Sequence, residues 1–207
     1  MPGAAGRAAR YRKVVVLARP GAGKSTQAAR LAELLGVDHL SSGSMIRGEV
    51  ASGSELGRRV APLVERGELV PDELVLSVVE PALARGLADH GGYVLDGFPR
   101  DVAQAKALDA LGRRPGRGDR AHDLGPELVL WLDVGADECR RRLLARSAIE
   151  NRSDDAARTI DRRLAAYELE TAPVLAYYED AGIVVVVDGV GAPELVEGRV
   201  AAAAGAA

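Results

Sequence analysis

Five short apolar runs alternate along the chain with longer segments in which apolar residues recur every three or four positions. The runs predict β-strands at residues 13–17, 39–42, 93–96, 128–134 and 183–188. Several of them are nearly continuous in Val, Leu and Ile, a pattern typical of strands buried on both faces of a parallel sheet. Because helical segments separate these strands, we expect an α/β fold: a five-stranded parallel sheet with helices on both faces.

The segments between the strands show the helical spacing of apolar residues. They predict helices over residues 25–35, 54–66, 71–87 and 155–180. Ser54 suits the N-cap of the second helix, because its hydroxyl can accept a hydrogen bond from a backbone N–H of the first turn. Proline lacks a backbone N–H and clashes with the preceding turn, so we expect bends or breaks at Pro62, Pro81 and Pro173.

The chain is organised as one domain with loose ends. Residues 1–12 are small and basic and predict a flexible leader, and the low-complexity residues 201–207 predict a frayed tail. Residues 13–200, between them, carry all the predicted strands and helices. Residues 112–126 are rich in Gly, Pro and charged side chains, which predicts a surface loop.

Composition excludes several classes of protein. Hydrophobic residues make up 47% of the 207 residues, enough for a globular core, and the net charge of −3 argues against a nucleic-acid partner. Cys139 is the single cysteine, so we expect neither a disulfide framework nor a structural zinc site. The apolar run 14–17 is too short to cross a bilayer, and the basic N-terminus lacks the apolar stretch of a signal peptide. We therefore expect a cytoplasmic protein without a membrane partner.

Residues 18–26 (ARPGAGKST) match the phosphate-binding P-loop pattern G-x-x-x-x-G-K-[ST], except that Ala18 stands at the first position. Gly21 and Gly23 let consecutive backbone N–H groups turn towards a phosphate with no side chain in the way. The helix that starts here adds unpaired N–H groups and the positive end of its dipole. Lys24 can reach the β- and γ-phosphates of a nucleotide. The sequence thus predicts a sheet of the P-loop NTPase type.

An ordinary glycine-rich turn is the plainer interpretation of this segment. The buried strand before it, the helix after it and the lysine at the expected position favour the P-loop. Two substitutions set it apart from the standard pattern: Ala18 requires that the first position has a negative φ, and Arg19 adds a bulky cation. The side chain of Arg19 either points outward or touches the nucleotide, and the sequence leaves both arrangements open.

From Lys13 to about Val200 the chain resembles the adenylate kinase family, because the motifs occur in the same order. The matching segments are GKSTQ (23–27), LSSGSMIR (40–47), GELVP (67–71), DGFPR (96–100), RLLAR (142–146) and RSDD (152–155). The resemblance implies a nucleoside-monophosphate kinase that transfers a phosphate from ATP to AMP and acts as a monomer. It also implies an acceptor-binding insertion at about 41–72 and a short lid, without zinc, at about 146–155.

The resemblance further implies which residues bind the two nucleotides. For ATP these are Gly21, Ala22, Gly23, Lys24, Ser25, Thr26, Arg142, Arg146 and Gly191. For AMP they are Ser42, Arg47, Glu68, Leu69, Val70, Gly97, Phe98, Pro99, Arg100, Gln104, Arg152 and Arg163. The residues expected to act in catalysis are Lys24, Arg100, Arg142, Arg152 and Arg163.

The same resemblance implies a Mg²⁺ site. Thr26 would supply the hydroxyl that binds Mg²⁺ directly, with Ser25 as a substitute, and Asp96 would orient water on the metal. Asp96 ends a predicted strand, at the edge where parallel sheets bind ligands. No catalytic histidine or nucleophile is needed, because phosphoryl transfer depends on positioning and charge neutralisation, and arginine forks suit phosphate oxygens. Surface or structural roles are expected for His39, His90 and His122.

The choice of acceptor depends on a few positions. Ser42 stands where adenylate kinases usually have threonine, and Gln104 stands where enzymes acting on AMP present an amide to the adenine edge. Four positions depart from the family pattern near the nucleotides: Ala18, Arg19, Ser25 and Ser44, the last of which is usually acidic. Two alternatives stay open: a kinase for another phosphorylated acceptor, and a nucleotide-binding protein with little turnover. A switch-type GTPase is disfavoured, because the sequence contains no Asn-Lys-x-Asp motif.

Overall fold

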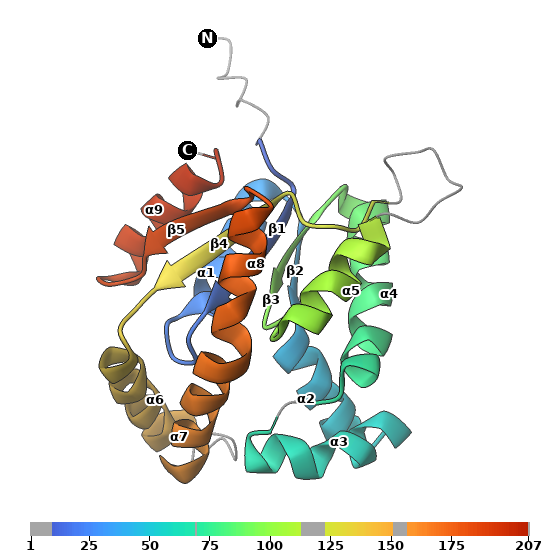
Figure 1. The fold of residues 1–207 in the computed structure, drawn as a ribbon, viewed down its shortest axis with the longest axis vertical. Coiled ribbons are helices and arrows are strands. Elements are labelled where there is room, and N and C mark those ends of the chain that lie inside the picture. The colour runs from blue at the N-terminus through green and yellow to red at the C-terminus, as the bar shows by residue number, and fades with distance from the viewer. Residues whose placement is uncertain (1–9, 69, 113–122, 151–156, 207) are drawn as a thin grey trace.

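The computed structural model describes residues 10–68, 70–112, 123–150 and 157–206. Within them, five strands form one parallel sheet in the order β2-β3-β1-β4-β5. The strands are β1 (Lys13–Ala18), β2 (Asp38–Ser41), β3 (Tyr93–Asp96), β4 (Leu128–Asp133) and β5 (Val184–Asp188). Helices cover both faces of this sheet (Figure 1), so the predicted fold class is confirmed.

The helices connect and flank the strands. They are α1 (Lys24–Leu35), α2 (Ser42–Ser52), α3 (Glu55–Arg66), α4 (Asp72–His90), α5 (Val102–Gly112), α6 (Ala136–Glu150), α7 (Ala157–Ala166), α8 (Ala172–Asp180) and α9 (Pro193–Ala203). A π-helical segment, η3 (Tyr167–Thr171), joins α7 to α8. Ser54 caps α3 as expected, because its Oγ accepts a hydrogen bond from the Gly57 N–H at 2.9 Å. The sequence prediction did not place α2, α5 or α9. In α2, Ile46 is the one large apolar side chain that is buried.

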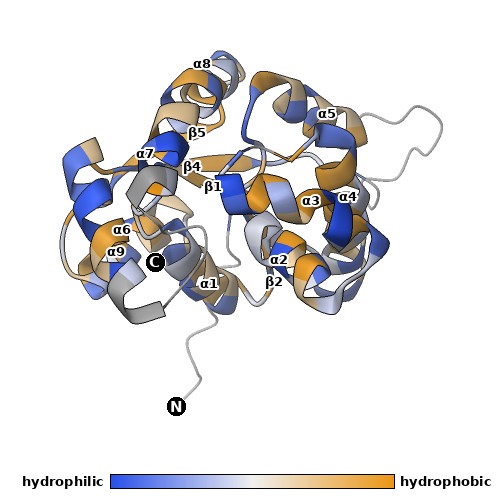
Figure 2. Ribbon diagram, turned by 90° about the horizontal axis from the view of Figure 1, so that it is seen from below, coloured by the Kyte–Doolittle hydropathy of each residue, from blue (hydrophilic) through white to orange (hydrophobic). Residues whose placement is uncertain are grey.

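Successive residues of β1 point into opposite layers of the core. Val14 and Val16 belong to a buried cluster with α1 and α9, whereas Val15 and Leu17 belong to a second cluster with α4, α5 and α8. All four side chains are almost inaccessible to solvent, and burial stabilises each by about 1.5–3 kcal/mol. Figure 2 shows the hydrophobic strand β4 in the middle of the molecule, between the two helical layers. This alternation explains why the strands are apolar at consecutive positions.

Two of the three internal prolines do not interrupt their helices. α3 continues through Pro62 and α4 continues through Pro81, so no break occurs at Pro81, whereas the bend expected at Pro62 and the kink that was the alternative at Pro81 stay predictions. Each proline removes one backbone hydrogen bond, but burial of the inner helix face, including Val60 in α3 and Val79 in α4, outweighs that loss. The helix predicted over 155–180 does change geometry, at η3, immediately before Pro173 in the first turn of α8.

Both ends of the described chain are more firmly attached than expected. Arg12, assigned to the leader, donates hydrogen bonds to the carbonyl oxygens of His90 at 2.6 Å and Gly91 at 3.2 Å. In the expected tail, α9 extends to Ala203, and Ala204 is fully buried against the core. The low-complexity sequence predicted a frayed end, but the side chain of Ala204 is small enough to be buried beside a helical layer. Residues 1–9 and 207 lie outside the described part of the chain.

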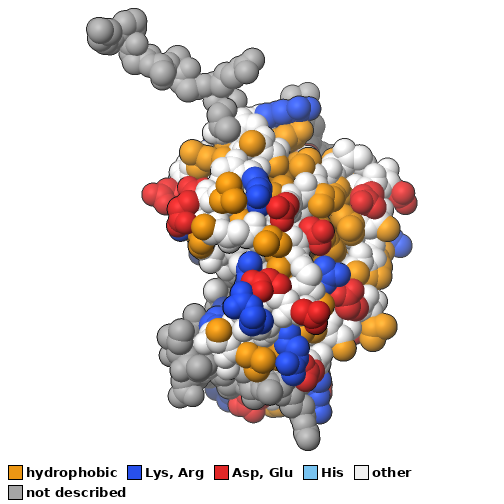
Figure 3. All heavy atoms as spheres, turned by 90° about the vertical axis from the view of Figure 1, so that its left-hand side faces the viewer, with side chains coloured by type: hydrophobic (Ala, Val, Ile, Leu, Met, Phe, Trp, Pro, Cys, Tyr) orange, Lys and Arg blue, Asp and Glu red, His pale blue; other side chains and the backbone are white. Residues whose placement is uncertain are grey.

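The molecular surface mixes charges of both signs. On the face drawn in Figure 3, basic side chains lie beside acidic ones. Arg30, for example, contacts Glu194 and Glu197 in the described structure. This mixture agrees with the low net charge of the chain, −3. Among the described residues, no helix combines the length and apolar character needed to cross a membrane.

Candidate functional site

The connection from β1 to α1 is a tight loop that needs glycine at two positions. Gly21 and Gly23 have φ angles of 88° and 91°, in the left-handed region that other residues rarely adopt. A Cβ atom at Gly21 would lie 2.5 Å from the carbonyl oxygen of Cys139 and 2.8 Å from Cγ of Leu143. The loop therefore rests directly on α6, and it directs the N-terminus of α1 towards a pocket lined by Lys24 and its neighbours.

We expect Gly21→Ala to lower the free energy of unfolding by about 2–4 kcal/mol, because a left-handed φ and a clash with backbone atoms act together. Urea denaturation followed by circular dichroism measures the change. Gly48→Ala, in an exposed part of α2 where an added Cβ meets no neighbour, is the control and should be neutral or slightly stabilising. Equal stability of Gly21→Ala and the wild type would contradict this account of the loop.

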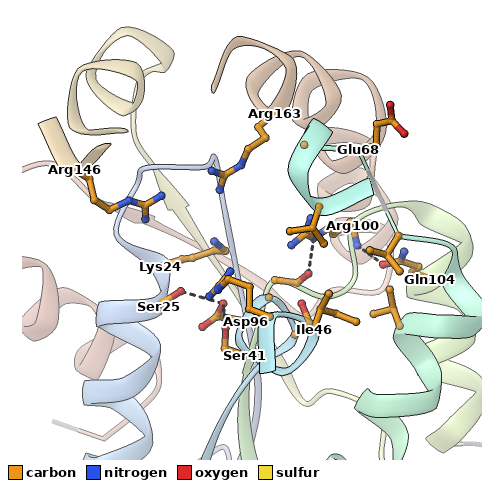
Figure 4. A pocket seen from close by; sticks show the side chains of 18 residues that line it. Lys24, Ser25, Ser41, Ile46, Glu68, Asp96, Arg100, Gln104, Arg146 and Arg163 are labelled. Carbon is orange, nitrogen blue, oxygen red and sulfur yellow. Dashed lines mark hydrogen bonds between the residues drawn. The ribbon is translucent and has the colours of Figure 1, made fainter. Parts of the chain in front are cut away.

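Lys24, the first residue of α1, is surrounded by cations. Figure 4 shows the side chains of Arg146 and Arg163 pointing towards it, with Arg100 on the other side of the pocket. Burial has the largest effect on Lys24, and together with the charges of these arginines it lowers the pKa from 10.5 to about 8, against an opposing contribution from Asp96. Cations held this close repel one another, and a polyanion bound among them would remove the repulsion. The arrangement is suited to a chain of phosphates.

Asp96 is the last residue of β3, and 2% of it is exposed. Its carboxylate accepts hydrogen bonds from Ser25 Oγ and Ser41 Oγ at 3.2 Å each, and lies 2.7 Å from His39 Nε2. Burial acts to raise the pKa of Asp96, but the hydrogen bond with His39 and the charge of Lys24 outweigh it and hold the pKa below its ordinary value. An ionised carboxylate is thus present beside the P-loop at neutral pH.

The sequence did not connect His39 with this site. β2 and β3 run parallel with Ser41 opposite Asp96, and His39 lies two residues before Ser41. Residues two apart in a strand point to the same face, so both side chains can reach the same carboxylate. The spacing of His39 and Ser41 therefore indicated that they share a face. Connecting them with Asp96 also required knowing that β2 pairs with β3.

The oxygen atoms near Asp96 fit a small divalent cation. Carboxylate and hydroxyl oxygens are the protein ligands that Mg²⁺ prefers, and the pocket also holds Lys24 for the phosphates that would share the metal. In the described part of the chain, Ser25 is the P-loop residue whose hydroxyl donates to Asp96, and Thr26 is not among the donors. Ser25, the alternative metal-binding hydroxyl that the sequence left open, thus lies 3.2 Å from the Asp96 carboxylate.

A cavity of about 120 Å³ extends from the P-loop to the predicted acceptor side. The predicted site residues that line it are Lys24, Ser25, Ser42, Arg47, Glu68, Val70, Asp96, Gly97, Arg100, Gln104, Arg146 and Arg163. Ile46, Val64 and Val75 add apolar surface, which suits the face of a nucleobase. None of these three side chains was predicted as a site residue, because apolar residues on helices are most simply interpreted as core.

Other predicted residues lie elsewhere. Phe98 is fully buried in the core, and Pro99 borders a second cavity of about 70 Å³ behind the P-loop. Arg142 Nε donates to Glu138 Oε1 at 2.6 Å within α6, and Gly191 lies in the turn between β5 and α9. Leu69 and Arg152 fall outside the described residues, as does the part of the predicted lid that follows residue 150.

Gln104 has its amide group held in place by two neighbours. Its Oε1 accepts a hydrogen bond from the backbone N–H of Arg100 at 2.8 Å, and its Nε2 donates to Asp72 Oδ1 at 2.7 Å. The side chain is 1% exposed, yet it lines the main cavity. An amide has a second N–H and a second lone pair, so these two bonds orient the group without exhausting its capacity to recognise a base edge.

Comparison with known proteins agrees with this geometry. The family model for adenylate kinase matches residues 16–183. An adenylate kinase of Thermus thermophilus is 45% identical over 192 residues, which cover 93% of this chain and 96% of the relative. The chain belongs to the adenylate kinase family. Two further adenylate kinases, from Thermobifida fusca and Stenotrophomonas maltophilia, are 42% and 40% identical over 90% and 92% of this chain.

Membership in the adenylate kinase family confirms the resemblance stated from the order of the motifs. The relatives are matched over nearly their whole length, 95% for the Thermobifida protein and 98% for the Stenotrophomonas protein, so the similarity extends beyond the P-loop. The contacts of individual residues with each nucleotide stay predictions.

Proposed function

We propose that this protein catalyses the reversible transfer of the γ-phosphate of ATP to AMP, giving two molecules of ADP. The observation that carries the proposal is the convergence of Lys24, Arg100, Arg146 and Arg163 on one pocket at the carboxyl ends of the strands. The transferring phosphoryl group spreads negative charge over its equatorial oxygens, and fixed cations stabilise that charge. A monomeric, cytoplasmic enzyme is part of the same proposal.

On the donor side, the backbone N–H groups that follow Gly21 would cradle the phosphates of ATP. Lys24 would bind the β- and γ-phosphate oxygens, with Arg146 and Arg163 on the opposite side of the same phosphates. Arg142 would lie against the adenine, held there by its bond to Glu138. Fixed cations and N–H dipoles of this kind would stabilise the charge on the transferring phosphoryl group.

On the acceptor side, Arg47 and Arg100 would hold the α-phosphate of AMP. The Arg100 side chain is oriented by its own Nε, which donates to the Gly97 carbonyl oxygen at 2.9 Å. Gln104 would read the adenine edge, while Ile46 and Val75 supply apolar contact to the ring. The two nucleotides would then face each other across Lys24, in the in-line arrangement that phosphoryl transfer requires.

Mg²⁺ that arrives with ATP would be held near Asp96 and Ser25, where it supplies charge neutralisation at the β- and γ-phosphates. The low pKa of Asp96 keeps its carboxylate ionised for this purpose. His39 and Ser41 would orient the Asp96 carboxylate by hydrogen bonds. In metal sites, groups that bond to the ligands in this way fix the orientation of the ligands.

We expect Ser25→Ala to weaken Mn²⁺ binding to the complex with a non-hydrolysable ATP analogue by about tenfold, because it removes the P-loop hydroxyl beside Asp96. Titration followed by electron paramagnetic resonance measures the affinity without turnover. Ser25→Thr keeps the hydroxyl and should retain most of the affinity. A loss in Thr26→Val with none in Ser25→Ala would instead return the metal-binding role to Thr26.

The proposed reaction is tested by offering Mg·ATP with AMP, dAMP, CMP, UMP, GMP or dTMP and separating the products by chromatography. We expect rapid ADP formation with AMP and much slower transfer to the pyrimidine nucleotides. Transfer to another acceptor would instead identify a kinase for that acceptor, the alternative suggested by the departures from the family pattern at Ser25 and Ser44. Tight nucleotide binding with no transfer to any acceptor would favour the binding protein.

A further inference from the structure

Arg19 points away from the pocket and joins the P-loop to η3. Its Nε donates a hydrogen bond to Glu168 Oε1 at 2.7 Å, and its Nη1 donates one to the carbonyl oxygen of Val134 at 3.1 Å. The guanidinium also lies 5.6 Å from the centre of the Tyr167 ring. Arg19 is among the lining residues of neither cavity described above. Of the two arrangements that the sequence left open, the structure therefore has the outward one.

The segment that Arg19 holds is connected to both phosphate-binding sides. At its far end, Thr171 Oγ1 donates a hydrogen bond to the carbonyl oxygen of Arg100 at 2.6 Å. Immediately before it, α7 carries Arg163, four residues ahead of Tyr167. The second cavity lies between these parts, and its lining includes Lys24, Arg100, Arg163, Tyr167 and Thr171. η3 is thus attached to the P-loop at one end and to the acceptor arginine at the other.

Contacts from other parts of the fold hold η3 in place, among them the packing of the buried Tyr167 ring 5.8 Å from that of Trp131. Buried side chains of α8, such as Val174 and Tyr178, fix that helix in the core. A π-helical turn departs from α-helical hydrogen bonding, and such segments are frequent at functional sites. α7 has core contacts of its own, since Ile160 is fully buried, so both helices that flank η3 are packed in the fold. The pair Arg19–Glu168, at the α7 side of the π-helical segment, supplies a contact between η3 and the P-loop.

We propose that Arg19 and Glu168 form a positioning pair, which holds η3 on the P-loop and so sets the distance of Arg163 from Lys24 during phosphoryl transfer. The proposal rests on the proposed function for its kinetic readout. A displacement of about 1 Å at a group that stabilises a transition state can lower the rate by up to about 100-fold, so a contact outside the pocket can control it. Arg19 is a positioning residue, because it acts through Arg163.

An arginine is suited to this task. Its planar group reaches a carboxylate, a carbonyl oxygen and an aromatic ring at the same time, which the single ammonium group of a lysine cannot do. The side chain is 24% exposed and that of Glu168 is 48% exposed, so the pair is partly shielded from water. A charge-assisted bond of 2.7 Å in this setting fixes geometry more than it adds to stability.

Arg19→Gln and Glu168→Gln each remove the ion pair between these residues, and Arg19→Gln also removes a weaker contact of 3.7 Å with Asp133. We expect each to lower kcat about tenfold and to leave KM for ATP and AMP within about twofold. Arg30→Gln is the matched control: its pair with Glu197 on α9 has a similar distance, 2.6 Å, and similar exposure, 32% and 45%, but lies away from η3. It should leave kcat unchanged. A rise in KM for ATP in Arg19→Gln with unchanged kcat would show that Arg19 contacts nucleotide, and would overturn the proposal.

A double-mutant cycle separates positioning from general destabilisation. In a background of Arg163→Ala, the group that the pair is proposed to position is absent, so Arg19→Gln should lower kcat by less than about twofold further. Effects of Arg19→Gln and Arg163→Ala that simply multiply would mean that the pair does not act through Arg163. That result would overturn the proposal even if both single variants were slow.

Amide hydrogen exchange tests the pair independently of activity. We expect residues 163–171 to exchange faster in Arg19→Gln and Glu168→Gln than in the wild type or in Arg30→Gln, because η3 loses its attachment. Unchanged exchange in both variants would overturn the positioning pair. A wild-type protein that transfers no phosphate to AMP would instead overturn the proposed function, and the exchange measurement would then decide the role of the pair alone.

Discussion

Lys24→Met is expected to lower kcat for transfer from ATP to AMP by about 10²–10³-fold while the protein remains folded. The ammonium group of Lys24 lies where Arg100, Arg146 and Arg163 converge. From the P-loop it can stabilise the negative charge on the transferring phosphoryl group. Methionine has a similar length and no charge. Steady-state kinetics with saturating Mg·ATP and AMP measure the loss, and circular dichroism verifies the fold.

The same substitution is expected to stabilise the protein when no nucleotide is present. The folded-state pKa of Lys24 is about 8, below the value of 10.5 for an unperturbed lysine, so the folded state binds the proton more weakly than the unfolded state does. Below about pH 8 the protonated lysine therefore destabilises the fold, by roughly 1–3 kcal/mol. The penalty disappears as pH rises from about 8 to 10.5. Lys24→Met should thus raise the melting temperature at pH 7, with a smaller gain near pH 10.

Lys106→Met provides the control for both measurements, because Lys106 is exposed on α5 and away from the pocket. It should leave kcat and the melting temperature at pH 7 nearly unchanged. Retained activity of Lys24→Met would contradict the site assignment. A lower melting temperature of Lys24→Met at pH 7 would contradict the electrostatic account of the cation cluster.

Arg100→Ala is expected to lower kcat/KM for AMP by about 10³-fold, with KM for ATP changed only a few-fold. Its guanidinium lines the main cavity and is oriented by the Gly97 carbonyl oxygen. The backbone at this position is bonded to Gln104 on one side and Thr171 on the other, and neither bond involves the Arg100 side chain. The local chain should therefore keep its path when the side chain is removed.

Two further variants sharpen the test of Arg100. Arg100→Lys keeps the charge but loses the planar fork, so it should recover only part of the activity towards AMP. Arg85→Ala, on an exposed position of α4, should behave as the wild type. If Arg100→Ala raised KM for ATP more than KM for AMP, the assignment of Arg100 to the acceptor side would be wrong.

Secondary structure was predictable wherever one signal dominated. The strands are recognised because consecutive buried positions in β1 and β4 leave no polar face, and the P-loop is recognised because Gly21, Gly23 and Lys24 occur at fixed spacing. α2 was missed because it buries little apolar surface. Of the kink or break expected at Pro81, the break does not occur, because packing of α4 against the core keeps the helix continuous.

The sequence by itself determined the fold class, the family and most of the residues that line the main cavity, because these depend on patterns within short segments. Only the tertiary structure decided which groups act on one another across the chain. His39 meets Asp96 because β2 pairs with β3, and Arg19 turns towards Glu168 because η3 lies against the P-loop. Such contacts join residues far apart in the chain, 57 and 149 positions in these two cases, and no local spacing records them.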